Sequence, residues 1–177
     1  MDWQGEVLGF WFALEPEQWW TRDANLDRRV RERFLPLWAA ERENVPAAFL
    51  GTCRDALAAV ILFDQFPRNM FRDHADQFST DMLALAVAKG AVERGYDAQV
   101  PPGRRPFFYM PFEHSEDLAD QERSLLLFTA LGDDYLLGFA RKHRDIIARF
   151  GRFPHRNALL GRAPRADELA AGNPVPW

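Results

Sequence analysis

Apolar side chains recur at steps of three and four residues along most of this chain, which is the spacing of one face of an α-helix. No segment shows the two-residue alternation of a half-buried strand beside a hairpin turn. The pattern predicts an all-α protein whose helices pack as a bundle or array, with residues 1–177 in a single domain. We expect helices at about 2–13, 25–41, 52–65, 76–94, 115–131, 133–151 and 166–170, and a loop over 97–112.

Several residues mark the expected ends of these helices. The hydroxyls of Thr52 and Ser115 suit an N-cap, and Gly95 suits a C-terminal cap. Because a residue that precedes proline disfavours the helical conformation, we expect the pair 66–67 to end its helix. Pro36 lies inside a helical pattern and should kink that helix.

The composition predicts a substantial core and excludes several classes of protein. Hydrophobic residues make up 47% of the chain and aromatic residues 14%, which excludes a disordered protein. A single cysteine, Cys53, excludes a disulfide framework and a Cys-rich zinc site. The net charge of −4 argues against a nucleic-acid partner. The longest apolar run, 56–63, is far shorter than the ~20 residues that span a membrane. Since the start also lacks a basic signal segment, we expect a cytoplasmic protein without a membrane partner.

Two segments far apart in the chain share one motif. Residues 63–69 read FDQFPRN and residues 150–157 read FGRFPHRN, so both follow F-x-x-F-P and then Arg-Asn, with His155 inserted in the second copy. We call them the first and the second Phe-Pro turn. Each copy can end a helix, with its arginine beside free carbonyls and its asparagine in a turn. Alternatively, the two turns face each other and line one polar cavity, as in a protein of two divergent halves.

Polar residues interrupt the apolar faces of three expected helices. Asp64 follows Leu57 and Ile61, and a buried carboxylate there needs a cationic partner. We expect an arginine from either Phe-Pro turn, with Arg152 or Arg156 as the first choice. Three further side chains occupy apolar positions and should point inward, where each needs hydrogen-bond partners. These are His114, Gln121 and His143.

The inward polar residues and the two turns together predict a pocket for a small anionic metabolite bearing a carboxylate, a phosphate or a peptide-like group. Three arginines would bind the anion, three amides would orient the ligand, and histidines beside a carboxylate would move protons. The anion-binding arginines are Arg68, Arg152 and Arg156. The orienting amides are Asn69, Gln121 and Asn157. Asp64 and His155 complete the ligand-binding set, and the candidate catalytic residues are Glu113, His114 and His143.

Other interpretations of the same residues stay open. The buried polar groups can form a purely structural network. Residues 113–116 with His143 and His155 offer metal-ligand chemistry for a metal-assisted hydrolase, but they lack His-x-x-x-His or Glu-x-x-His spacing. We therefore assign no metal, and we assign no cofactor because no nucleotide-binding glycine motif occurs. A hydrolytic Ser-His-Asp triad has less support still, because no G-x-S-x-G motif occurs. Whether the protein is an enzyme is left open.

Four segments together resemble the uncharacterised bacterial family called domain of unknown function 924. They are 8–12 (LGFWF), 64–69 (DQFPRN), 109–117 (YMPFEHSED) and 149–157 (RFGRFPHRN). The similarity runs from about Val7 to Leu169. It implies an all-helical, tetratricopeptide-like fold and no established activity, substrate or catalytic residue. Since tetratricopeptide-like folds often hold peptides, a protein- or peptide-binding scaffold without catalysis is the alternative to a metabolite pocket. Ala163-Pro164 departs from the family pattern at the expected cap of the last helix.

Overall fold

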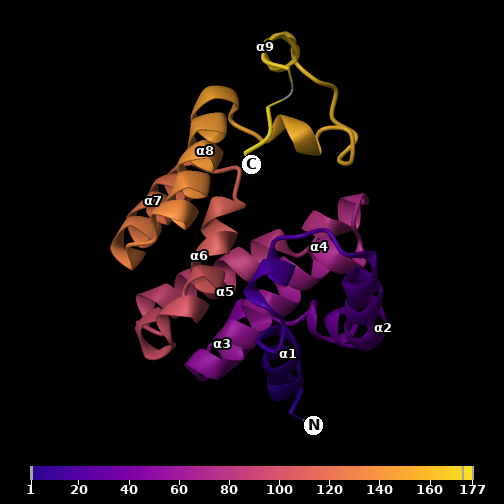
Figure 1. Cartoon of the computed structure of the whole chain (residues 1–177), viewed down its shortest axis with the longest axis vertical. Coiled ribbons are helices and arrows are strands. Elements are labelled where there is room, and N and C mark those ends of the chain that lie inside the picture. The colour runs from indigo at the N-terminus through magenta and orange to yellow at the C-terminus, as the bar shows by residue number, and fades with distance from the viewer. Residues whose placement is uncertain (1, 173, 177) are drawn as a thin grey trace. The chain divides into compact units, whose positions relative to one another are not determined.

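The computed structural model describes residues 2–172 and 174–176, and it confirms the predicted all-α fold (Figure 1). The described residues include no β-strand, and none of their helices is long and apolar enough to cross a membrane. The chain divides into two compact units, unit 1 (Met1–Phe108) and unit 2 (Tyr109–Trp177). The structure confirms helices; the tetratricopeptide-like arrangement stays a prediction.

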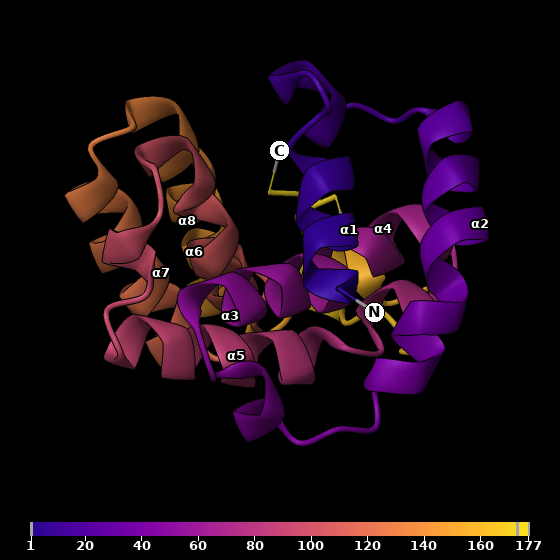
Figure 2. The same cartoon turned by 90° about the horizontal axis from the view of Figure 1, so that it is seen from below.

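Unit 1 is built from an almost uninterrupted apolar helical segment and the helices that pack against it. This segment comprises α3 (Cys53–Val60), a π-helical segment (Ile61–Gln65) and α4 (Phe66–Met70). Every residue from Ala56 to Pro67 is buried, because this segment is apolar on nearly all sides. Three helices pack against it, and Figure 2 shows α5 alongside α3. They are α1 (Trp3–Trp11), α2 (Ala24–Glu41) and α5 (Asp81–Glu93).

The prediction that residues 66–67 end the helix is wrong, because the chain stays helical as far as Met70. Proline has no N–H to donate to the carbonyl four residues earlier, and its ring collides with that carbonyl in a regular α-helix. Here the helix widens to a π-helix just before Pro67, and the carbonyl of Phe63 accepts a hydrogen bond of 2.7 Å from the Thr80 hydroxyl instead. Pro36 lies within the uninterrupted α2.

We predict that Thr80→Val destabilises the protein by roughly 2–3 kcal/mol, since it leaves two buried polar groups unsatisfied. Thr80 is 4% exposed, and its hydroxyl donates to Phe63 O and accepts from Trp38 Nε1 at 3.2 Å. Valine has nearly the same volume but no hydroxyl, so packing is retained. Urea unfolding measures the change. Thr21→Val is the control, because the Thr21 hydroxyl makes its hydrogen bond at the surface; an equal loss in both variants would contradict this explanation.

Unit 2 begins within α6 (Pro106–Glu113) and continues with a helical hairpin (Figure 1). The hairpin consists of α7 (Leu118–Leu131) and α8 (Asp134–Phe150), joined through Gly132 in the left-handed conformation. A short 3-10 turn (Pro154–Arg156) and α9 (Ala166–Ala170) complete the unit. Its core contains Ile146, Ile147 and Phe150 from the last turns of α8 and Phe153 just after that helix.

Two local predictions in this region are wrong. The expected loop over 97–112 contains α6, which includes Pro111 and has an apolar composition that suits a buried helix. The N-cap of α7 is Asp117 rather than Ser115, because the Asp117 carboxylate accepts hydrogen bonds from the N–H groups of Ala119 and Asp120. The Ser115 hydroxyl instead donates to Asp120 Oδ2 at 2.9 Å. The Thr52 cap is confirmed, since its hydroxyl accepts from the N–H of Asp55.

Candidate functional site

The candidate site in unit 2 centres on a hydrogen-bonded pair formed by His143 of α8 and Glu113 at the end of α6. His143 Nδ1 lies 2.8 Å from Glu113 Oε1 and 2.9 Å from the carbonyl oxygen of Phe139. Both neighbours can only accept a hydrogen bond when Glu113 is ionised, so Nδ1 carries the proton. In the neutral imidazole Nε2 therefore holds the free electron pair. The two side chains are 12% and 8% exposed, which places this pair almost wholly inside the protein.

Two further histidines surround this pair. The ring of His114 lies 6.3 Å from that of His143. The rings of His143 and His155 each lie 5.5 Å from that of Phe153. The structure therefore gathers the three predicted histidines of unit 2 with Glu113.

Burial lowers the pKa of His155 to about 4, and the positive charge of Arg156 acts in the same direction. His155 is therefore neutral at neutral pH.

We predict an acid-sensitive contribution of His155 to stability. The pKa of His155 is about 4 in the folded protein and near 6.5 in the unfolded chain. Between pH 4 and pH 6.5 the unfolded chain therefore binds more protons than the folded protein does. This contribution is complete above pH 6.5 and is lost as the pH falls towards 4. We expect about 1–2 kcal/mol after allowance for partial solvent exposure. Urea unfolding of wild type and His155→Gln from pH 7 to 4 measures it. A stability difference between the two proteins that stays constant with pH would contradict the prediction.

Gln121, on α7, fixes the backbone around Glu113 and leaves one polar atom unused. Its Nε2 donates to the carbonyls of Glu113 and Ser115, both at 2.6 Å. These acceptors fix the orientation of the amide, because only the nitrogen can donate to a carbonyl. The Gln121 Oε1 and the Ser124 hydroxyl are buried, and neither has a hydrogen-bond partner among the described residues. Such buried polar atoms are exceptional in proteins and usually have a water or ligand partner.

Ser124 is a residue that the sequence analysis missed. It lies one turn after Gln121 on α7 and is fully buried, as Gln121 is. The available signal was the i, i+3 spacing of two polar residues followed by the apolar Phe128 on the same side of the helix.

The second Phe-Pro turn is held by two internal carboxylates. Arg152 donates to both oxygens of Glu168, at 2.5 and 2.8 Å, and Asn157 donates to Glu168 Oε2 at 2.9 Å. Arg162 forms a bidentate pair with Glu116, at 2.6 and 2.9 Å. These ion pairs lower the pKa of Glu116, whose burial opposes the effect, and hold that of Glu168 far below its ordinary value, mainly through Arg152. Arg152 and Asn157 are thus engaged by protein carboxylates.

The first Phe-Pro turn is held in the same manner within unit 1. Arg68 donates to both oxygens of Asp81, at 2.9 and 3.1 Å. Asn69 donates to Asp27 Oδ1 at 2.8 Å, and Arg72 makes a bidentate pair with the same carboxylate. Each turn therefore contains an arginine and an asparagine that bind protein carboxylates, although Arg152 does not occupy the motif position of Arg68.

The predicted site residues divide between the two units. In unit 1, Asp64 is fully buried, lies 3.5 Å from Arg68 and accepts a hydrogen bond from Gln65. In unit 2, Arg156 is buried with its guanidinium 4.5 Å from the centre of the Phe153 ring. Two expectations stay predictions because each involves both units. One is a cavity shared by the two turns, and the other is a pairing of Asp64 with an arginine of the second turn.

The described residues contain no group of three His, Cys, Asp or Glu side chains that could hold a metal ion. Nothing in this part of the chain therefore favours the metal-assisted hydrolase over the other interpretations.

Comparison with known proteins agrees with the resemblance seen in the motifs. A family model described as a bacterial protein of unknown function, DUF924, matches residues 7–171. The solved structure of ATU0120, a protein of unknown function from Agrobacterium tumefaciens, shares 40% sequence identity over 95% of each chain, with a TM-score of 0.87. Among curated proteins none matches. The chain therefore belongs to the bacterial DUF924 family.

Proposed function

We propose that the protein binds a small anionic metabolite beside the Glu113–His143 pair, and that His143 moves a proton to or from this ligand. The observation that carries the proposal is the position of His143 Nδ1 between the Glu113 carboxylate and the Phe139 carbonyl. This arrangement fixes the ring and its tautomer, with Nε2 as the proton acceptor. A carboxylate on the far side of an imidazole also stabilises the imidazolium that forms when Nε2 takes a proton.

The unused polar atoms of α7 indicate the chemistry of the ligand. Gln121 Oε1 can accept from an N–H or O–H group, and the Ser124 hydroxyl can donate to a carbonyl or carboxylate. A metabolite with both kinds of group, such as an amino acid or a short acidic peptide, fits this pair of atoms.

The anion-binding arginine of this proposal is Arg156 in unit 2, whose guanidinium lies 4.5 Å from the centre of the Phe153 ring. As part of this proposal we place the protein in the cytoplasm, where its lone cysteine stays reduced.

Thermal-shift and calorimetric titrations with glutamate, succinate, glutathione and phosphate test the proposal. A bound metabolite at about 100 times its Kd should stabilise the protein by about 2.7 kcal/mol. The shift should disappear in His143→Ala and remain in His74→Ala, because His74 is a largely exposed histidine of unit 1. If no acid stabilises the wild type, or if His143→Ala responds as the wild type does, the proposal is wrong.

A peptide-binding scaffold is the second candidate, and one observation favours it. The α7–α8 hairpin carries exposed apolar side chains, with Leu126 63% and Tyr135 66% exposed. Saturable binding of an apolar peptide, lost in Leu126→Ser and kept in Met82→Ser, would support this function. Met82 is the matched control because it is 76% exposed on unit 1.

A further inference from the structure

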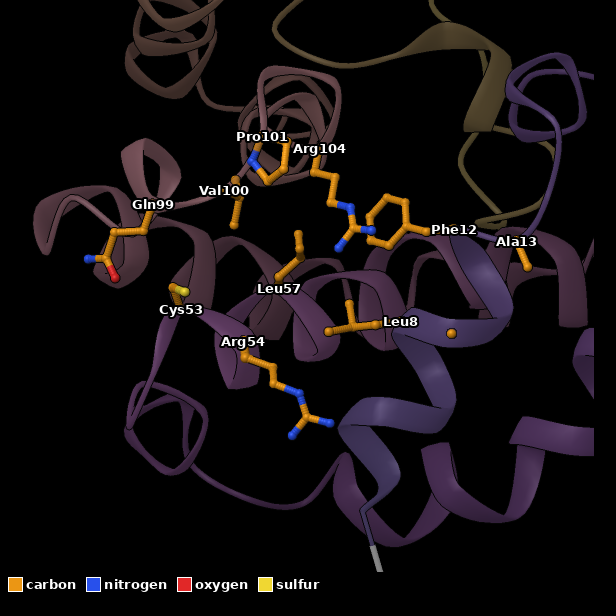
Figure 3. Close-up of a pocket in the computed structure, with 11 residues that line it drawn as sticks. Leu8, Phe12, Ala13, Cys53, Arg54, Leu57, Gln99, Val100, Pro101 and Arg104 are labelled. Carbon is orange, nitrogen blue, oxygen red and sulfur yellow. The ribbon is translucent and has the colours of Figure 1, made fainter.

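A cleft with a volume of about 560 Å³ opens in unit 1, and no part of the site described above contributes to it (Figure 3). Its lining comes from α1 and the residues just after it, from residues 53–57 of α3, and from residues 99–104. This volume lies within the range of sites that bind small molecules, about 300–1,000 Å³.

The interior of the cleft is mostly apolar. Leu57 and Val100 lie at its base, and they are only 2% and 9% exposed. Leu8 and Phe12 add apolar surface from the side of α1 (Figure 3). A ligand with an apolar body would displace water from these side chains, which favours its binding.

Arg104 gives the cleft a positive charge that pairs with no carboxylate of residues 2–172 and 174–176. Its guanidinium lies 4.2 Å from the centre of the Phe12 ring, and it has no ion pair with any described residue (Figure 3). Contact with the ring restrains the guanidinium, whose N–H groups can donate two parallel hydrogen bonds to a carboxylate. Arg54, the other arginine of the cleft, differs because Asp2 already pairs with it.

We propose that this cleft binds an amphipathic monocarboxylate. Arg104 would bind its carboxylate, and its aliphatic or aryl body would lie on Leu8, Leu57 and Val100. The apolar base and the unneutralised guanidinium together set this ligand class. The proposal is independent of the one for Glu113 and His143.

Cys53 provides a direct measurement, since it is the only cysteine of the chain and it lines this cleft. The rate at which iodoacetamide alkylates Cys53 should fall at least fivefold when octanoate saturates the cleft. Octanamide has the same body without the charge, and acetate has the charge without the body. We expect protection by either compound to need at least tenfold higher concentrations. Equal protection by octanamide and octanoate, or no protection by octanoate, would overturn the proposal. Circular dichroism excludes unfolding by the fatty acid, which would accelerate alkylation.

Variants of Arg104 test the proposed anion contact. Arg104→Gln should raise the concentration of octanoate needed for protection by roughly tenfold or more, the usual effect of losing a charge-assisted hydrogen bond. Arg29→Gln is the matched control, because Arg29 also lies over a phenylalanine, Phe10, but does not line this cleft. An Arg104→Gln protein that octanoate protects as well as the wild type would contradict the assignment.

Gly9 allows the cleft itself to be blocked. It lies on α1 at the edge of the cleft, and a Cβ built there meets no atom within 4 Å. Gly9→Leu should therefore fold and weaken protection by octanoate at least tenfold, whereas Gly9→Ala should bind almost as the wild type does. Unchanged protection in Gly9→Leu would show that octanoate binds elsewhere. His143→Ala should keep full protection, so failure of the unit 2 proposal would leave this result unaffected.

Discussion

Replacing Phe66 with alanine should lower the free energy of unfolding by roughly 3–5 kcal/mol, the usual cost of deleting a buried aromatic ring. Phe66 is fully buried in unit 1, where its ring centre lies 4.5 Å from that of Phe34 and 5.7 Å from that of Trp11. The lost ring removes apolar contacts, leaves a cavity and abolishes three aromatic pairs, with Phe10, Trp11 and Phe34. Since its neighbours belong to α1 and α2, little rearrangement can fill the space.

Two substitutions separate this effect from general sensitivity to mutation. Phe66→Leu keeps an apolar side chain and should cost less than half as much as Phe66→Ala, because the remaining cavity is smaller. Met82→Ala should change stability by less than about 0.5 kcal/mol, since Met82 is 76% exposed. Urea unfolding followed by tryptophan fluorescence measures all three variants. If Phe66→Ala costs under 1 kcal/mol, the described packing of unit 1 is wrong.

Helical periodicity predicted the long amphipathic helices well, because their apolar residues follow one face for many turns. The α2 helix is the clearest case: of the apolar residues at three- and four-residue steps, Leu26, Val30, Phe34 and Trp38 are buried, whereas Leu37 is half-buried. Sequence patterns failed at Phe66 and Pro67, where we expected proline to end the helix. The Phe66–Pro67 pair continues a helix because the Thr80 hydroxyl, from a distant segment, satisfies the freed carbonyl. Nothing in the local sequence around residue 66 contains that information.

The ion-pair partners of the two Phe-Pro turns could not be predicted for a similar reason. The motif identified the arginines and asparagines, but their carboxylate partners are distant in sequence. Asn69 binds Asp27, which lies 42 residues earlier, and Phe153 N donates to Glu116, which lies 37 residues earlier. A sequence motif gives residue types at fixed spacing, whereas these partners depend on which helices pack together.

These partners change the interpretation of the turns. Arg68 and Arg152, two of the three predicted anion-binding arginines, each form a bidentate pair with a protein carboxylate. An incoming anion would have to displace Asp81 or Glu168, and Glu168 is fully buried. This geometry favours the helix-end interpretation for both arginines. The inward positions of Glu113 and His143 thus become the stronger basis for a site than the repeated motif itself.

Substituting Glu113 should have the largest effect on function if His143 moves a proton. Glu113→Gln preserves the shape of the side chain and its ability to accept a hydrogen bond from Nδ1, but it removes the negative charge. The imidazolium formed when Nε2 takes a proton then lacks its stabilising partner. We expect proton transfer to the ligand to slow by about 10²- to 10⁴-fold, the usual contribution of a general acid or base. Deuterium incorporation into a bound ligand from heavy water, followed by NMR, measures this rate.

A second readout separates the positioning role of Glu113 from a merely structural one. The ¹⁵N chemical shifts of the His143 ring report which nitrogen carries the proton. Wild type should show the proton on Nδ1, because both the Glu113 carboxylate and the Phe139 carbonyl accept from it. Glu113→Gln should keep this tautomer while losing proton transfer, whereas Glu113→Ala should lose both the restraint on the ring and the activity. A Glu113→Gln protein that exchanges deuterium as fast as the wild type, with His143 unchanged, would leave the Glu113–His143 pair as a structural contact only.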